Sequence, residues 1–148
     1  MKFMKIEEKS DNAVLNIALD TLNIGKQALV FANTKKSAEK AAEEISKKLK
    51  GGNEALKALA DEALKALPRP TKQCERLAFC LGNGIAFHHA GLVEKQRNLI
   101  EENFRNGTVK IICCTPTLAY GVDLPAYRAI VKDLKRYTLH GLSWIPVL

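Results

Sequence analysis

The sequence contains no apolar stretch close to the roughly 20 residues that a helix needs to cross a bilayer. Its start, MKFMKIEEKSDN, also lacks the apolar core of a secretory signal peptide. Both features argue against a membrane-spanning or exported chain. We therefore expect a cytoplasmic, intracellular protein with no membrane partner.

The four cysteines form no CxxC pair and have no histidine at ligand spacing. Zinc sites usually present their ligands in such compact patterns, so we expect no metal site. Cys113 and Cys114 lie inside an apolar run, which is typical of reduced core thiols in an intracellular protein. No activating group stands near them in the sequence, which argues against a catalytic cysteine.

Neither a GxxxxGK[ST] phosphate loop nor a GxGxxG segment occurs in the chain. These loops surround nucleotide phosphates with backbone N–H groups. We therefore expect no independent nucleotide triphosphate site and no catalytic residue in this chain. Any contact with ATP has to be completed by another domain.

What the chain does contain is an excess of basic residues, 23 Lys and Arg against 16 Asp and Glu, giving a formal net charge of +7. A positive field attracts polyanions and strengthens phosphate contacts. Basicity alone leaves nucleic-acid binding and simple solvation of the lysines equally open. With 47% apolar residues, the 148-residue chain has the size and composition of one domain with a single core.

Short apolar runs alternate with amphipathic helix patterns along the sequence. The runs that predict buried parallel strands lie at 27–33, 84–89, 109–115 and 128–133. Helical spacing predicts helices near 11–22, 38–49, 56–67, 74–81 and 92–106. Because each parallel return needs a crossover helix, the pattern predicts an α/β domain with a doubly wound parallel sheet over 1–148. We interpret the two helices within 53–81 as an insertion between core strands.

Polar, small or basic residues follow directly after the predicted strands. They are Asn33–Thr34, His89–Ala90–Gly91, Thr115–Pro116–Thr117, and Asp133 with Lys135 and Arg136. Ligands of open parallel sheets bind beyond the carboxyl ends of the strands. Backbone N–H groups, hydroxyls and charges at this edge suit phosphate and sugar groups, so we expect ligand contacts there.

The adjacent His88 and His89 raise the question of a metal site. Successive strand residues point to opposite faces, so the two imidazoles would not converge on one ion. We interpret His88 as a packed core histidine. His89, at the strand end, is the better functional candidate.

Three separated segments, ALVFANTKKSAE, FHHAGLVEKQR and TPTLAYGVDLPA, carry a family resemblance. In order and spacing they resemble the second RecA-like motor domain, of the helicase C-terminal type, of archaeal superkiller-like superfamily-2 DNA helicases. The likeness spans about residues 11–148. It implies a RecA-like parallel sheet with covering helices and a role in ATP-dependent unwinding or translocation on DNA, of the fork-repair type.

The resemblance assigns roles to two of the strand-end segments. Residues 31–35 correspond to motif IV, where Thr34 is the hydroxyl contact to nucleic acid, and its alternative role is an N-cap for the following helix. His89, Gly91 and Arg97 match the nucleic-acid-binding segment between motifs IV and V. There Arg97 contacts a phosphate, or is a solvated helix charge.

Residues 115–125 resemble motif V. The resemblance implies that Thr115 and Thr117 contact nucleic acid, while Gly121 and Asp123 approach the ATP ribose. Relatives often carry asparagine at the position of Asp123. The alternatives are a turn glycine with positive φ at Gly121 and a turn cap at Asp123.

Other parts of the family pattern are expected outside this chain. Motif VI, with its QxxGRAGR pattern, should begin just after Leu148, and the Walker A and Walker B motifs belong to the preceding domain. We therefore expect a fragment that is inactive alone. In the complete protein we expect ATP and Mg2+, the upstream RecA-like domain, downstream domains, and single-stranded or forked DNA as partners.

Three alternative functions stay open at this point. An RNA helicase of the same branch would use similar motifs. A nucleic-acid-binding or protein-docking module without a motor role would need only the basic surface. A small α/β enzyme, such as a sugar-nucleotide transferase, would need an acid–base pair at the strand ends, where Asp133 is the only candidate.

Overall fold

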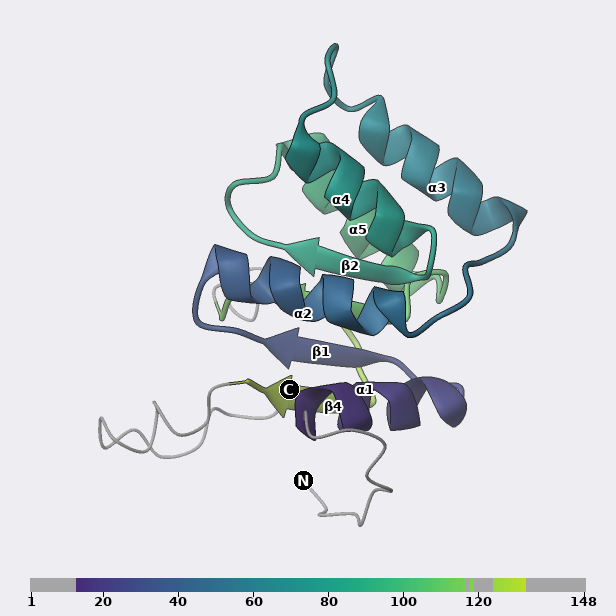
Figure 1. The fold of residues 1–148 in the computed structure, drawn as a ribbon, viewed down its shortest axis with the longest axis vertical. Coiled ribbons are helices and arrows are strands. Elements are labelled where there is room, and N and C mark those ends of the chain that lie inside the picture. Colours follow the sequence, from purple (N-terminus) through teal and green to yellow (C-terminus); the bar gives the residue numbers. More distant parts are fainter. Residues whose placement is uncertain (1–12, 117, 119–123, 133–148) are drawn as a thin grey trace.

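The computed structural model describes residues 13–116, 118 and 124–132, and its strands form one parallel sheet with the order β2-β3-β1-β4. The strands are β1 (Ala28–Phe31), β2 (Ile85–His88), β3 (Ile111–Cys114) and β4 (Arg128–Val131). All four lie within the apolar runs that predicted them. The expected α/β class with a parallel sheet is confirmed (Figure 1).

The helices of the described residues are α1 (Ala13–Asn23), α2 (Lys35–Lys47), α3 (Glu54–Leu64), α4 (Lys72–Leu81) and α5 (Glu94–Arg105). All five predicted helices occur. Three of them begin at a side-chain cap, because Thr34, Asn53 and Thr71 each accept a hydrogen bond from the backbone N–H three residues further on. Gly107, with φ of 88°, follows the end of α5, in a conformation that favours glycine.

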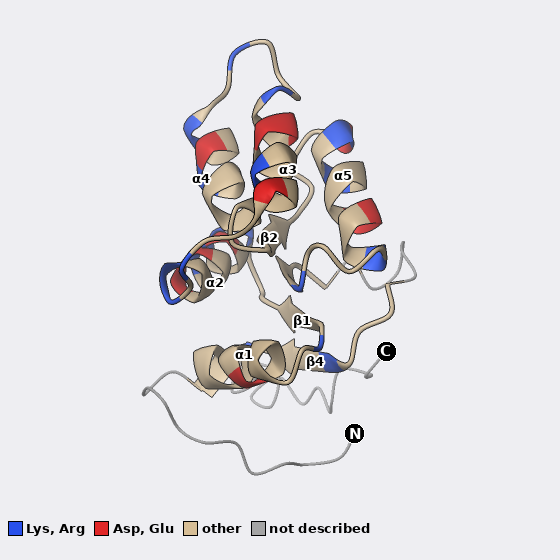
Figure 2. Ribbon diagram, turned by 90° about the vertical axis from the view of Figure 1, so that its right-hand side faces the viewer, with Lys and Arg blue, Asp and Glu red and all other residues tan. Residues whose placement is uncertain are grey.

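The helices cover the sheet from two sides. Figure 1 shows α1, α2 and α4 in front of the strands, and Figure 2 places α5 across β2 from α2 and α4. Contacts within the fold agree, since α2 packs on β2 and β3, α4 on β2, and α1 on β1 and β4, whereas α5 packs on β2. Strand β2 therefore lies between helices on both faces.

The helices of the predicted insertion at 53–81 differ in their packing. Helix α4 contacts β2 directly, whereas α3 packs mainly on α4. The buried side chain of Gln96 joins them to α5, since its Nε2 donates to the carbonyl oxygen of Ala63 at 3.1 Å and to Sγ of Cys74 at 3.4 Å. The pair is thus fixed to the core, and its status as an insertion remains a prediction.

The core consists of the first three strands and the helix faces that cover them. Every residue of β1, β2 and β3 is buried. Cys113 and Cys114 lie inside this core, as predicted, and burial raises the pKa of Cys114 to about 12. No helix in the described part of the chain combines the length and apolar character needed to span a membrane.

Candidate nucleic-acid interface

The carboxyl ends of the four strands lie at one edge of the sheet. In the parallel register Phe31 is aligned with Cys114 and Val131, and His88 is aligned with Cys114. The segments that follow the strands therefore begin at the same level, on the side of the arrowheads in Figure 1. Thr115, which follows β3, starts between the segments that follow β1 and β2. Three predicted segments from distant parts of the sequence are thus brought together.

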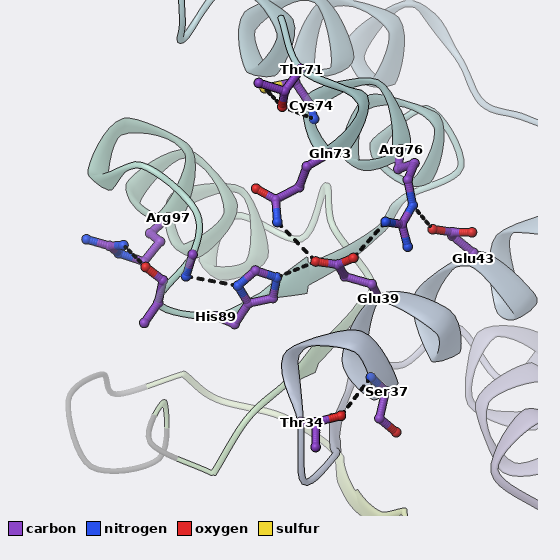
Figure 3. Close-up of polar contacts among 12 residues, drawn as sticks. Thr34, Ser37, Glu39, Glu43, Thr71, Gln73, Cys74, Arg76, His89 and Arg97 are labelled. Atoms are coloured by element: carbon purple, nitrogen blue, oxygen red, sulfur yellow. Dashed lines mark hydrogen bonds and ion pairs between the residues drawn. The ribbon is translucent and has the colours of Figure 1, made fainter.

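Thr34 caps helix α2 at this edge. Its Oγ1 accepts a hydrogen bond from the backbone N–H of Ser37 at 3.0 Å, which confirms the N-cap interpretation (Figure 3). A hydroxyl that accepts one bond still has its own hydrogen to donate. The exposed Thr34 can therefore cap the helix and donate to a phosphate oxygen at the same time, and the second role stays a prediction.

The His89 ring is buried and contacts protein at both nitrogens. Its Nε2 lies 2.7 Å from Oε2 of Glu39, and its Nδ1 accepts the backbone N–H of Gly91 at 3.0 Å. Because Nδ1 is an acceptor, the ring hydrogen is on Nε2, which donates to the carboxylate. The ring also stacks on Phe87, with 5.7 Å between centroids. Direct contact of His89 with nucleic acid remains a prediction that this structure does not favour.

Gly91 and Arg97 shape the turn between β2 and α5. A Cβ atom at Gly91 would lie 2.9 Å from Cε1 of His89, so the close approach of the ring requires glycine. The guanidinium of Arg97 donates to the carbonyl oxygens of Leu92 and Ala90. Arg97 is therefore anchored to this turn, unlike a freely solvated helix charge, and its phosphate contact stays a prediction.

The motif V segment is described only in part. Thr115 is half-buried directly after β3, and its carbonyl oxygen accepts the N–H of Leu118 at 3.2 Å. Thr117, Gly121 and Asp123 lie outside the described residues, as do Asp133, Lys135 and Arg136. The roles assigned to Thr115 and to these residues remain predictions.

A buried carboxylate that we did not predict lies beneath the edge. Oε2 of Glu39 contacts His89 and also accepts from Nε2 of Gln73 at 3.1 Å, while Oε1 pairs with Nη1 of Arg76 at 2.8 Å (Figure 3). Burial opposes ionisation of Glu39. The hydrogen bonds from His89 and Gln73 and the charge of Arg76 outweigh this effect and lower the pKa of Glu39 below its ordinary value.

One sequence signal could have identified Glu39. The residue is in helical phase with Ala42 and Ser46, which are buried on the inner face of α2. An acidic residue among buried positions needs a partner, because an unpaired buried charge is costly. The partners His89 and Arg76 are too distant in the sequence for local patterns to indicate them.

His88 and His89 contact carboxylates on opposite sides of the sheet. Nε2 of His88 lies 2.8 Å from Oε2 of Glu101 on α5, whereas His89 contacts Glu39 on α2. This divergence follows from the alternation of side chains along a strand. It confirms His88 as a packed core histidine.

The burial of His88 predicts a pH-dependent stability. Desolvation lowers the pKa of His88 below its ordinary 6.5, although Glu101 acts in the opposite direction. The unfolded chain therefore binds this proton more tightly than the folded chain. We expect the free energy of unfolding to fall as the pH is lowered through 6.5, and to stop changing below the folded pKa of His88.

The variant His88→Gln tests this expectation, because glutamine keeps a donor for Glu101 but does not titrate. Urea unfolding at a series of pH values should show a flatter pH dependence for the variant on the acid side of 6.5. Equal slopes for the variant and the unsubstituted chain would contradict the assignment to His88.

Charge does not by itself mark the candidate interface. Figure 2 shows acidic and basic residues together on α3, α4 and α5. These three helices carry six Lys and Arg against seven Asp and Glu, so the net charge of +7 comes from residues outside them. The candidate interface depends on the strand ends.

Comparison with known proteins supports the resemblance to helicase C-terminal domains. The family model of the helicase conserved C-terminal domain matches residues 65–134. The ATP-dependent DNA helicase Hel308 of Methanocella arvoryzae is 46% identical over 156 residues, which cover 99% of this chain and 21% of the relative. This chain belongs to the helicase C-terminal domain family. The matched segment contains the predicted site residues from His89 to Asp123.

Two further relatives bear the same name. Hel308 of Methanococcus vannielii is 40% identical over 149 residues, covering 99% of this chain and 20% of the relative. Hel308 of Pyrococcus horikoshii is 41% identical over 139 residues, which cover 93% of this chain and 19% of the relative. This helicase C-terminal domain thus spans about a fifth of the length of the curated relatives it matches.

Proposed function

We propose that this domain is one of two RecA-like motor domains of an ATP-dependent DNA helicase that unwinds or translocates on single-stranded or forked DNA. The supporting observation is a likeness of 40–46% identity to proteins named ATP-dependent DNA helicases, over 93–99% of the chain. In this proposal the upstream RecA-like domain and downstream domains of the same polypeptide are its partners.

The domain contributes a grip on one strand. Thr34, Thr115, Thr117 and Arg97 contact the sugar-phosphate backbone at the edge formed by the strand ends. Gly91 lets the turn after β2 pack closely on His89 beneath it. Contacts of this kind carry no base information, so binding has little sequence preference and weakens with salt.

The domain also forms one wall of the ATP cleft. Gly121 and Asp123 contact the ribose, and the phosphates bind mainly to the preceding domain. Closure of the two domains around ATP and reopening after hydrolysis alternate their grips on the strand. Mg2+ is proposed for the complete protein, where it accompanies the ATP phosphates.

The alternatives have less support. The relatives' name favours DNA over RNA, and their ATP dependence favours a motor over a passive binding module. Glu39 and His89 are residue types of an acid–base pair, as an α/β transferase would need. Their side chains are only 8% and 1% exposed, so a substrate cannot reach them in this conformation.

The test is the ATPase activity of the complete polypeptide, with single-stranded DNA and single-stranded RNA of the same sequence. We expect DNA to stimulate hydrolysis more than RNA does. Stronger stimulation by RNA would indicate an RNA helicase. Binding without any stimulated hydrolysis would indicate a non-motor module and contradict the proposal.

A further inference from the structure

We propose that His89 and Glu39 are positioning residues, which set the exposed turn Ala90–Gly91 in the conformation that contacts the nucleic-acid backbone. This inference rests on the proposed function and changes the role of His89 from a direct contact to a support. It also gives helix α4 a part in the interface, because Gln73 and Arg76 hold Glu39.

The first step concerns the orientation of the His89 ring. The turn depends on an unprotonated Nδ1, because only that form accepts the N–H of Gly91, at 3.0 Å. The Glu39 carboxylate, 2.7 Å from Nε2, favours the tautomer with its hydrogen on Nε2. Stacking on Phe87 fixes the ring plane. The carboxylate thus determines which nitrogen faces the turn.

The second step concerns the rigidity of Glu39 itself. Its two oxygens have three partners, which are His89 directly after β2 and both Gln73 and Arg76 on α4. A buried carboxylate with this many partners cannot rotate without losing several hydrogen bonds. The position of α4 is therefore transmitted through Glu39 to the His89 ring.

The third step concerns what is presented at the surface. Ala90 and Gly91 are exposed, although His89 beneath them is buried. Arg97 holds the other side of the turn through the carbonyl oxygens of Ala90 and Leu92. The turn lies at the same edge as Thr115. A fixed backbone segment at this place suits a sugar-phosphate chain, because preorganised contacts lose less entropy on binding.

Two substitutions of His89 separate its two hydrogen bonds. In His89→Asn, Oδ1 occupies the place of Nδ1 and can accept the N–H of Gly91, as in an Asx turn, but cannot reach Glu39. In His89→Gln, the amide can donate to Glu39 but offers no acceptor at the Nδ1 position. If the hydrogen bond to Gly91 positions the turn, DNA binding should be weakened more by His89→Gln than by His89→Asn.

The experiment measures the DNA-stimulated ATPase activity of the complete polypeptide. For His89→Gln we expect the DNA concentration for half-maximal stimulation to rise about five- to tenfold, the effect of one lost hydrogen bond. For His89→Asn we expect a rise of less than about threefold. Hydrolysis at saturating DNA should change less than the half-maximal concentration in both variants, because the turn is assigned to DNA binding.

Substitutions on α2 provide the matched pair. In Glu39→Gln, His89 and Arg76 compete for a single oxygen, so we expect a rise similar to that of His89→Gln. Glu43 pairs with Arg76, whereas the ring nitrogens of His89 contact Glu39 and Gly91. Glu43→Gln should therefore leave the half-maximal DNA concentration unchanged. Nitrogen-15 NMR of the His89 ring should show an unprotonated Nδ1, and Glu39→Gln should shift the ring toward the other tautomer.

The outcomes separate the two proposals. DNA-stimulated hydrolysis with equal half-maximal concentrations for His89→Asn and His89→Gln would overturn the positioning role. The same holds if the half-maximal concentrations of all variants merely follow their thermal stabilities. An unsubstituted protein that DNA does not stimulate would overturn the proposed function, and this inference with it.

Discussion

Replacement of Phe87 by alanine is expected to lower the free energy of unfolding by about 3–5 kcal/mol. The side chain of Phe87 is fully buried. It belongs to β2, the strand that helices cover on both faces of the sheet. Its removal loses the transfer free energy of the ring and leaves a cavity that a close-packed core fills only in part. It also removes the aromatic ring on which His89 stacks.

The matched control is Phe79→Ala on helix α4. Phe79 is 47% exposed, so the same chemical change should alter the free energy of unfolding by only about 0.5 kcal/mol. Urea unfolding of both variants, followed by circular dichroism, gives the two values. Similar losses for Phe79→Ala and Phe87→Ala would mean that β2 is not packed as described.

The second large effect is on DNA binding. The double variant Thr115→Ala with Arg97→Ala should bind single-stranded DNA about tenfold more weakly, because it removes one hydroxyl and one guanidinium from the proposed interface. The salt dependence should also decrease, with the slope of log affinity against log salt falling by about one.

The control for charge is Arg105→Ala, at the other end of α5. It removes the same positive charge from the same helix, but away from the strand ends. Fluorescence anisotropy with labelled DNA at several salt concentrations should show a small change for this variant. Equal weakening by Arg105→Ala and the double variant would indicate general basic attraction, and the assignments of Thr115 and Arg97 would then be wrong.

The elements of the fold followed from the sequence, but their ends did not. The run 109–115 predicted a strand of which only Ile111–Cys114 belongs to the ladder. Val109 is buried and apolar, yet its N–H donates to the carbonyl oxygen of Asn103 in the last turn of α5. Hydropathy reports burial, whereas a strand end depends on hydrogen-bond partners elsewhere in the chain.

The location of the candidate site was likewise predictable from the sequence, but the contacts within it were not. The rule for open parallel sheets identified the segments at Thr34, His89 and Thr115, because it depends only on where strands end. It did not identify the direction of the His89 ring, which is set by Glu39, 50 residues away in the sequence. Contacts of this range depend on how α2 packs over β2, which no local pattern encodes.

The close approach of Gly91 to His89 also constrains how this turn can change during evolution. Any side chain at position 91 would collide with the imidazole ring while His89 is present. A smaller residue at position 89 would remove that collision, although it would sacrifice the contact with Glu39. The two positions are therefore expected to be epistatic: a side chain at position 91 should cost less once position 89 no longer carries the ring.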